Sequence, residues 1–184
     1  KSLEELNFAL REGVGRIVVD SFNELERLEE LSADLGITAK ILLRVTPGVE
    51  AHTHEFISTG QEDSKFGFTV ASGLAAEAVD RARRSNHLDL FGLHAHIGSQ
   101  VFDVEPFAKA VAVLAEFAAP FDFPELSVGG GLGVPYVEGE SAPSIKEWAE
   151  AIFEACSKAG VKSLVSSEPG RSIVASGAVT LYTV

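Results

Sequence analysis

The sequence predicts an α/β fold built on a parallel sheet, either open or closed into a barrel. Apolar, β-branched runs alternate along the chain with amphipathic stretches of helical period. Strands that are separated by helices pair in parallel, because each connection has to cross the sheet. The expected strands are Arg16–Asp20, Lys40–Thr46, Leu90–Ile97, Leu126–Val128 and Ser163–Ser166. Periodicity alone does not distinguish an open sheet from a barrel.

Capping signals place helices between these strands. A capping box, a Ser followed three residues later by a Glu, occurs at Ser2, Ser21 and Ser144. Two further helices are expected over Ala71–Ser85 and Val104–Ala119. Cys156 continues the apolar stripe of Trp148 and Ile152, so we expect a buried and inert thiol.

The composition is that of a globular chain of 184 residues, 46% hydrophobic and 23% charged. A net charge of −12 argues against a nucleic-acid or anionic-membrane surface. The sequence contains no run of 18 apolar residues, so no transmembrane helix is predicted. The acidic first residues do not resemble a signal peptide. The single cysteine fits a reducing compartment, the cytoplasm. Because the chain lacks Met and begins in helix-like sequence, we expect a piece of a longer protein.

Two segments leave the alternating pattern. Pro47–Gly67 has no clear periodicity, and a loop of this length is usually functional or part of an interface. It carries His52, His54, Asp63 and Lys65. The last residues, Val179–Val184, are predicted to form a further strand.

A glycine-rich turn follows the strand Leu126–Val128. Gly129, Gly130 and Gly131 stand in succession, then Leu132 and Gly133. Consecutive glycines let backbone N–H groups approach an anion, which favours a phosphate site. A tight turn that needs glycine for packing alone is the alternative. The turn is not the dinucleotide fingerprint, because Val134 stands where the third glycine is required.

A second motif, Glu168-Pro169-Gly170-Arg171, follows the last predicted strand. A carboxylate held at a strand end can pair with a heterocyclic nitrogen, and Arg171 can bind a phosphate or carboxylate. The alternative is a Glu–Arg pair that closes a turn. Active sites of parallel α/β folds are built at this edge of the sheet.

Histidines in two H-x-H pairs are the third candidate group. His94 and His96 share a strand, where residues two apart face the same way. His52 and His54 repeat the spacing, so a metal site competes with hydrogen-bonded structural histidines. Arg44, near a strand end, and Lys65 are further candidate cations, although a solvated charge explains an exposed Lys equally well.

Together these residues resemble the diaminopimelate decarboxylases. The matching stretches are "RVTPGVEAHTHEFISTGQEDSKFGF" from residue 44, "FGLHAHIGSQ" from 91, "GGGLGVPY" from 129 and "SEPGRSIVA" from 167. The resemblance implies a pyridoxal 5'-phosphate cofactor and a (β/α)8 barrel of the alanine racemase-like type. This chain would supply only the later strands of that barrel, over residues 1–178. Residues 179–184 would start a crossover strand to a C-terminal β domain.

The resemblance also implies roles for individual residues. His96 would stack on the cofactor ring, Glu168 would bond the pyridine nitrogen, and Ser99 and Gly131 would contact the phosphate. Arg171 would meet the phosphate or the distal carboxylate of the substrate. Other residues implied near the cofactor are Gly129, Gly130, Pro169, Gly170 and Arg44. Lys65 matches a lysine that pairs across a dimer interface in related decarboxylases.

The family's Schiff-base lysine lies in a Y-A-x-K-like motif that none of the lysines here matches. We therefore expect a homodimeric, cytoplasmic parent enzyme that makes L-lysine and CO2 from meso-2,6-diaminopimelate, and an inactive isolated chain. The expected partners are an amino-acid substrate and a second subunit, with no nucleic acid, membrane or metal. Alternatives are a related decarboxylase of another basic amino acid, a lysine-less regulatory homologue, or a barrel metallohydrolase that uses the H-x-H pairs.

Overall fold

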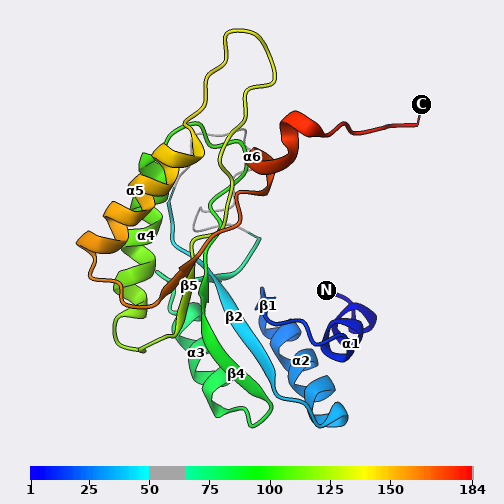
Figure 1. The fold of residues 1–184 in the computed structure, drawn as a ribbon. Helices are drawn as coiled ribbons and strands as arrows, with labels where there is room; N and C mark the ends of the chain where they lie inside the picture. Colours follow the sequence, from blue (N-terminus) through cyan, green and yellow to red (C-terminus); the bar gives the residue numbers. More distant parts are fainter. Residues whose placement is uncertain (50–64, 184) are drawn as a thin grey trace.

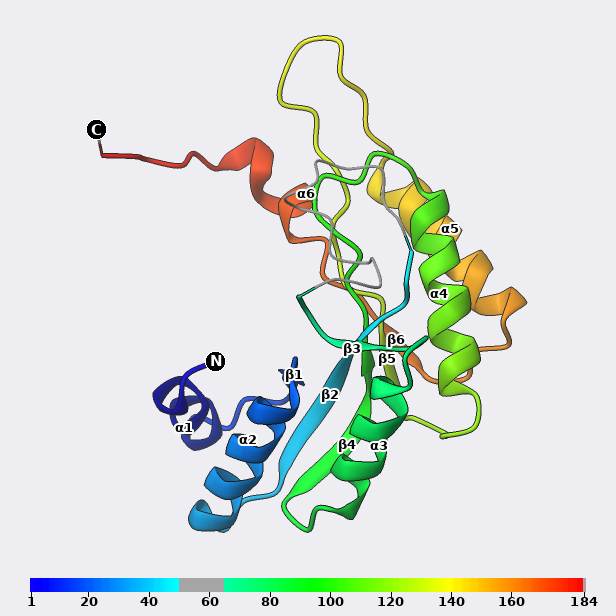
Figure 2. The same ribbon diagram turned by 180° about the vertical axis from the view of Figure 1, so that it is seen from behind.

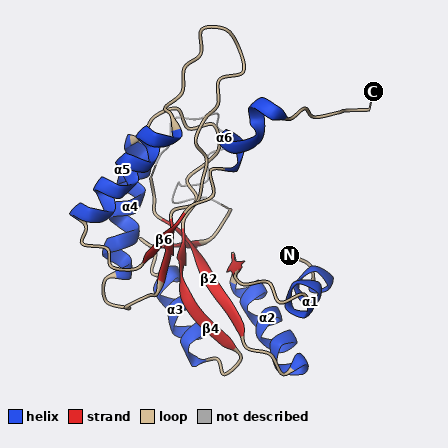
Figure 3. Cartoon of the chain, viewed as in Figure 1, coloured by secondary structure: helices blue, strands red, loops and turns tan. Residues whose placement is uncertain are grey.

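A parallel sheet of order β1-β2-β4-β5-β6 runs through the computed structural model, which describes residues 1–49 and 65–183 (Figures 1 and 3). A short strand, β3, pairs with β2 off this path. The strands are β1 Ile17–Val19, β2 Ala39–Thr46, β3 Phe68–Thr69, β4 Leu88–His94, β5 Glu125–Ser127 and β6 Leu164–Ser166. The helices are α1 Leu3–Arg11, α2 Phe22–Leu35, α3 Leu74–Arg84, α4 Glu105–Ala118, α5 Ile145–Lys158 and α6 Gly170–Val174, followed by the 3-10 turn η2 Ala175–Gly177.

Two of the three predicted capping boxes are complete. The hydroxyls of Ser2 and Ser144 accept from the backbone of the Glu three residues on, and each Glu carboxylate accepts in return. At Ser21 only the first bond forms, because the Glu24 carboxylate accepts from the Asp20 backbone and from Lys1 instead. Hydroxyl caps therefore begin α1, α2 and α5 at the predicted residues.

Strand β2 shows how the sheet separates its two faces. Alternate residues from Ala39 to Val45 enter the main hydrophobic core together with apolar residues of α1 to α4. The intervening residues Lys40 and Arg44 point to the opposite face, where Lys40 lies over the Phe91 ring and Arg44 pairs with Asp20. The helices thus cover one face, and the other carries charged and polar side chains.

An ion pair across this second face shows that the sheet is curved. Arg16 precedes β1, yet its Nε lies 3.0 Å from Oε2 of Glu125 on β5. In a flat sheet β1 and β5 would be roughly 14 Å apart, since two strands lie between them. That is farther than the two side chains reach together. The sheet therefore bends toward this face, as an arc of a barrel does.

Helices α4 and α5 pack side by side and form a second core with the loops above the sheet (Figure 2). Phe107 meets Trp148 edge to face, with ring centroids 5.7 Å apart. Cys156 is buried in this core, and burial raises the pKa of its thiol. The predicted burial of Cys156 is confirmed, and its inertness stays a prediction.

The structure differs from the sequence predictions at four places. Strand β4 ends at His94 rather than Ile97, so His96 lies in the following loop. Helix α6 begins where the sequence predicted only a turn, and β3 was not predicted. Residues 179–183 are exposed coil and not the predicted strand, since a strand requires a neighbour to pair with (Figure 1). No helix within the described ranges is long and apolar enough to cross a membrane.

Candidate active site

A row of polar side chains crosses the sheet at its carboxyl edge. In register, Arg44 on β2 stands beside His94 on β4, His94 beside Ser127 on β5, and Ser127 beside Ser166 on β6. Residues that pair across parallel strands share a face, so this row lies on the concave side, opposite the helices. Loops of residues 95–101, 129–134 and 167–169 follow these strands and rise above the row.

The glycine-rich turn is wedged between the other two loops. Gly131 has a φ of +107°, and a Cβ there would overlap the Gly98 carbonyl. A Cβ at Gly130 would overlap the Glu168 carbonyl on the opposite side. Close backbone packing thus explains these glycines without any ligand, as in the alternative interpretation of the turn. The phosphate role stays a prediction.

Gln100 ties the glycine turn to the loop after β4. Its backbone is left-handed, with a φ of 58°. The side-chain amide donates to the Val134 carbonyl at 3.1 Å and accepts from the Val134 N–H at 2.9 Å. Backbone bonds from Val101 to the Gly131 carbonyl and from Gly133 to the Val101 carbonyl run alongside, both at 2.9 Å. These four hydrogen bonds therefore join the two loops.

A cavity of about 570 Å³ opens between these loops and α6. Its lining includes six of the predicted site residues: His96, Ser99, Gly131, Glu168, Gly170 and Arg171. Tyr136, Val174, Ala175, Ala178 and Thr180 complete it. Gly129, Gly130 and Pro169 support the lining instead: the Glu168 N–H donates to the Gly129 carbonyl at 2.7 Å, and Pro169 precedes α6.

Glu168 supplies the carboxylate of this cavity. Its Oε1 accepts from His94 Nε2 at 3.0 Å and, more weakly, from the Ser127 hydroxyl at 3.5 Å. The hydrogen bond from His94 lowers the pKa of Glu168, aided by Ser127 and the two imidazoles, against the opposing effect of partial burial. Glu168 is therefore ionised at neutral pH.

His96 is held by the glycine turn. Its Nδ1 accepts from the Gly130 N–H at 3.3 Å. Burial lowers the pKa of His96, and the charge of Arg44 lowers it further. The imidazole is therefore neutral at pH 7 and presents a flat, uncharged ring to the cavity.

Arg171 faces the same cavity from α6. Its guanidinium donates to the Tyr136 hydroxyl at 2.8 Å and to the Ser99 hydroxyl at 3.1 Å. Within the described residues Arg171 makes no ion pair with Glu168, so a Glu–Arg turn closure is not what holds this motif. The cation and the hydroxyls form a group separate from the carboxylate.

The two other predicted cations lie outside the lining. Arg44 pairs with Asp20 at 3.3 Å and stacks over Phe66, and its charge acts on Glu168 without direct contact. Lys65 is exposed beside the Phe66 ring, at 5.1 Å from the centroid.

The metal-site alternative finds no support in residues 1–49 and 65–183. Within these ranges no cluster of three His, Cys, Asp or Glu side chains could hold a metal ion. His94 donates to Glu168 instead, and His96 contributes to lowering the pKa of the same carboxylate. His52, His54 and Asp63 lie outside the described residues.

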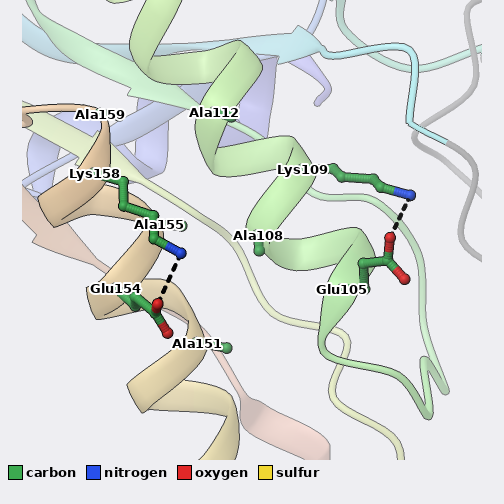
Figure 4. Close-up of a pocket in the computed structure, with 9 residues that line it drawn as sticks. All are labelled: Glu105, Ala108, Lys109, Ala112, Ala151, Glu154, Ala155, Lys158 and Ala159. Atoms are coloured by element: carbon green, nitrogen blue, oxygen red, sulfur yellow. Dashed lines mark ion pairs between the residues drawn. The ribbon is translucent and has the colours of Figure 1, made fainter.

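A second cavity, of about 510 Å³, lies on the outer surface between α4 and α5 (Figure 4). Alanines line much of it, and its charged side chains pair with each other: Glu105 with Lys109 and Glu154 with Lys158, both at 2.7 Å. It offers no unpaired polar group for a ligand. The cavity at the strand ends is therefore the candidate active site.

Comparisons with known proteins agree with this choice. The model of the family "pyridoxal-dependent decarboxylase, pyridoxal binding domain" matches residues 1–175. The chain belongs to this family. Its curated relatives include the diaminopimelate decarboxylases of Mycobacterium tuberculosis, 44% identical, and Bacillus subtilis, 43% identical, each over the whole chain. The chain spans 44% of the length of either relative.

Solved structures give the same result. The chain matches diaminopimelate decarboxylase from Helicobacter pylori complexed with L-lysine, with a TM-score of 0.86 and 37% identity over 95% of this chain and 44% of that one. The corresponding enzyme from M. jannaschii, in co-complex with L-lysine, matches with a TM-score of 0.84 and 34% identity. That match covers 94% of this chain and 42% of the M. jannaschii chain. With the curved parallel sheet, these matches confirm the expected partial barrel.

The residues of this pyridoxal-dependent decarboxylase domain fit the cofactor that the family name implies. Pyridoxal phosphate carries an anionic phosphate, a flat ring and a ring nitrogen that can be protonated. The cavity offers Arg171 and Ser99 as an anion-binding group, the neutral His96 ring, and the ionised Glu168. These three groups match the phosphate, the ring and the ring nitrogen in turn.

Three residues that hydrogen-bond to the predicted site residues Arg171 and Glu168 were not themselves among the predicted site residues. Tyr136 was quoted only within a matching stretch, and His94 only as a candidate metal ligand or a hydrogen-bonded structural histidine. Ser127 lies in no motif. For His94 and Ser127 the available signal was position, because they end neighbouring strands with side chains on the concave face.

Proposed function

We propose that the protein carrying this chain is a pyridoxal-phosphate-dependent decarboxylase that converts meso-2,6-diaminopimelate to L-lysine and CO2. The observation that carries the proposal is an ionised Glu168 facing the same cavity as Arg171, Ser99 and the His96 ring. Identity of 43–44% to curated diaminopimelate decarboxylases over the whole chain supports the substrate. So do the two similar enzymes solved with L-lysine, the product.

Glu168 has the central role in the chemistry. When bound, pyridoxal phosphate supplies a protonated pyridine ring that accepts the electron pair left behind as the substrate carboxylate departs as CO2. Glu168 keeps the proton on the ring nitrogen, because an ionised carboxylate next to a base favours its cationic form. The lowered pKa of Glu168 serves this role, since a neutral carboxylic acid would lose the charge attraction.

The other lining residues bind and orient the cofactor. His96 stacks on the ring, while Ser99, Gly131 and Arg171 hold the phosphate through a hydroxyl, a backbone N–H and a guanidinium. Arg171 could equally meet the distal carboxylate of the substrate. Arg44 adds positive charge near the ring. Gly129, Gly130, Pro169 and Gly170 shape the backbone around these groups.

The assembly proposed for the whole protein is a cytoplasmic homodimer, with Lys65 at the subunit interface. The exposed position of Lys65 leaves it accessible to a second subunit. A net charge of −12 supports a protein that binds neither nucleic acid nor anionic membranes. Residues 1–178 would form the barrel part, and 179–184 would lead toward a C-terminal β domain.

The experiment that tests this function measures CO2 release by the full-length protein loaded with pyridoxal phosphate. Meso-diaminopimelate, ornithine and arginine are supplied separately. Release from diaminopimelate alone is expected, and Glu168→Ala should abolish it. Release from another amino acid would keep the chemistry but overturn the substrate, and absence of release from all three would overturn the proposal.

A further inference from the structure

His94 is a buried polar residue for which the proposed function has no role. It ends β4 on the concave face, with 5% of its surface exposed. Its Nε2 donates to Glu168 on the loop after β6, so the contact joins two strands that are not neighbours in the sheet. A buried side chain that reaches across β5 to the cavity carboxylate is placed to control that carboxylate.

The hydrogen bonds of Glu168 fall on one of its two carboxylate oxygens. His94 and Ser127 both contact Oε1, at 3.0 and 3.5 Å. Oε2 makes no hydrogen bond or ion pair within residues 1–49 and 65–183. The carboxyl group is thus held by one oxygen and has the other available for a ligand, while roughly half of the side chain is open to solvent.

The donor on this contact is fixed by chemistry. An ionised carboxylate only accepts hydrogen bonds, so Nε2 of His94 must carry a proton. Nδ1 is buried and has no hydrogen-bond partner in the described part of the chain. The Glu168 contact is therefore the polar interaction that sets the orientation of the His94 ring.

Neighbouring groups do not replace His94 in this role. Arg44 stands beside it in register but is engaged with Asp20 at 3.3 Å. Ser127 approaches Oε1 only at 3.5 Å, a distance at which a hydroxyl contributes little.

We propose that His94 is a positioning residue. Its hydrogen bond to Oε1 of Glu168 holds the carboxylate so that Oε2 faces the pyridine nitrogen of bound pyridoxal phosphate. The proposal rests on the proposed function only in assigning that nitrogen to Glu168. Without His94 the carboxylate can rotate toward solvent, and the ring nitrogen loses a fixed partner.

The test compares four variants of the full-length protein, together with Glu168→Gln as a separate check of the proposed function. His94→Leu removes the donor at similar size, and His94→Gln keeps a donor near the position of Nε2. His94→Asn is polar but too short to reach, so it replaces the Leu variant if that variant does not fold. Ser127→Ala removes the longer contact and is the matched control. The first readout is the dissociation constant of pyridoxal phosphate, and the second is the ¹⁵N chemical shift of the labelled ring nitrogen in the bound cofactor.

Loss of the donor should weaken cofactor binding about five- to tenfold, the range for a charge-assisted bond on a half-exposed group. The ring-nitrogen signal should move toward that of the unprotonated pyridine in His94→Leu and His94→Asn. It should stay near wild type in His94→Gln and Ser127→Ala. This pattern would support the proposal whatever amino acid the enzyme decarboxylates.

Three results would contradict the reasoning. An unchanged ring-nitrogen signal in both His94→Leu and His94→Asn, with the cofactor still bound, would overturn the positioning role. Equal effects in His94→Gln and His94→Asn would show that His94 acts only by packing. If Glu168→Gln also leaves the ring nitrogen protonated, the assignment of Glu168 in the proposed function fails instead.

Discussion

Replacing Gly131 by alanine should destabilise the fold more than the same change at Gly139, although both have positive φ angles, +107° and +89°. At Gly139 no atom lies within 4 Å of the added Cβ, so only backbone strain of about 1 kcal/mol is expected. At Gly131 the Cβ overlaps the Gly98 carbonyl, and overpacking adds about 2 kcal/mol. Gly131→Ala should therefore cost about 3 kcal/mol.

Urea unfolding of the full-length protein, followed by circular dichroism, measures this difference. With a slope near 2 kcal/mol per molar urea, the two midpoints should differ by about 1 M. Cofactor binding should weaken in Gly131→Ala alone, because the displaced backbone lies beside Ser99 in the cavity. Equal midpoints for the two variants would refute the argument that loop packing, rather than φ alone, requires glycine at this position.

Three further outcomes are expected. Arg171→Lys should weaken pyridoxal phosphate binding about fivefold in a fluorescence titration, since an ammonium lacks the planar pair of N–H groups with which the guanidinium reaches Tyr136 and Ser99 together. The pKa of Glu168 is lowered in the folded protein, so its bond to His94 stabilises the fold above about pH 4.5 and loses this effect as pH falls through the lowered pKa. Acid unfolding of His94→Leu should accordingly show a smaller loss of stability below pH 4.5 than that of wild type. Cys156 should resist alkylation in the folded protein and react only on unfolding, as mass spectrometry of its peptide would show. Alkylation in the native state would contradict the burial.

Long, strongly patterned elements were predictable from sequence, and short ones were not. The eight residues of β2 and the capped helices α1, α2 and α5 lie where the apolar periods and serines indicate. Strand β3, with two residues, and α6, with five, are too short to show a period. The strand expected over 179–184 illustrates another limit, because β propensity forms a ladder only beside a partner strand.

The site residues that lie in recognisable sequence motifs were predictable. His96, Ser99, Gly131, Glu168 and Arg171 all line one cavity, as residues at neighbouring strand ends should. The contacts between them depend on register and rotamers, which a single sequence does not reveal. Arg171 therefore bonds Ser99 and Tyr136 rather than Glu168, and Glu168 finds His94 instead.

The Arg16–Glu125 pair has a consequence for the order in which the chain folds. The two residues are 109 positions apart, and closing a loop of that length in an unfolded chain costs about 4 kcal/mol of entropy. Prior pairing of β1 with β2, β2 with β4 and β4 with β5 shortens the effective loop, because each step joins nearer segments. We therefore expect the ion pair to close after the four strands have aligned and bent, late in folding.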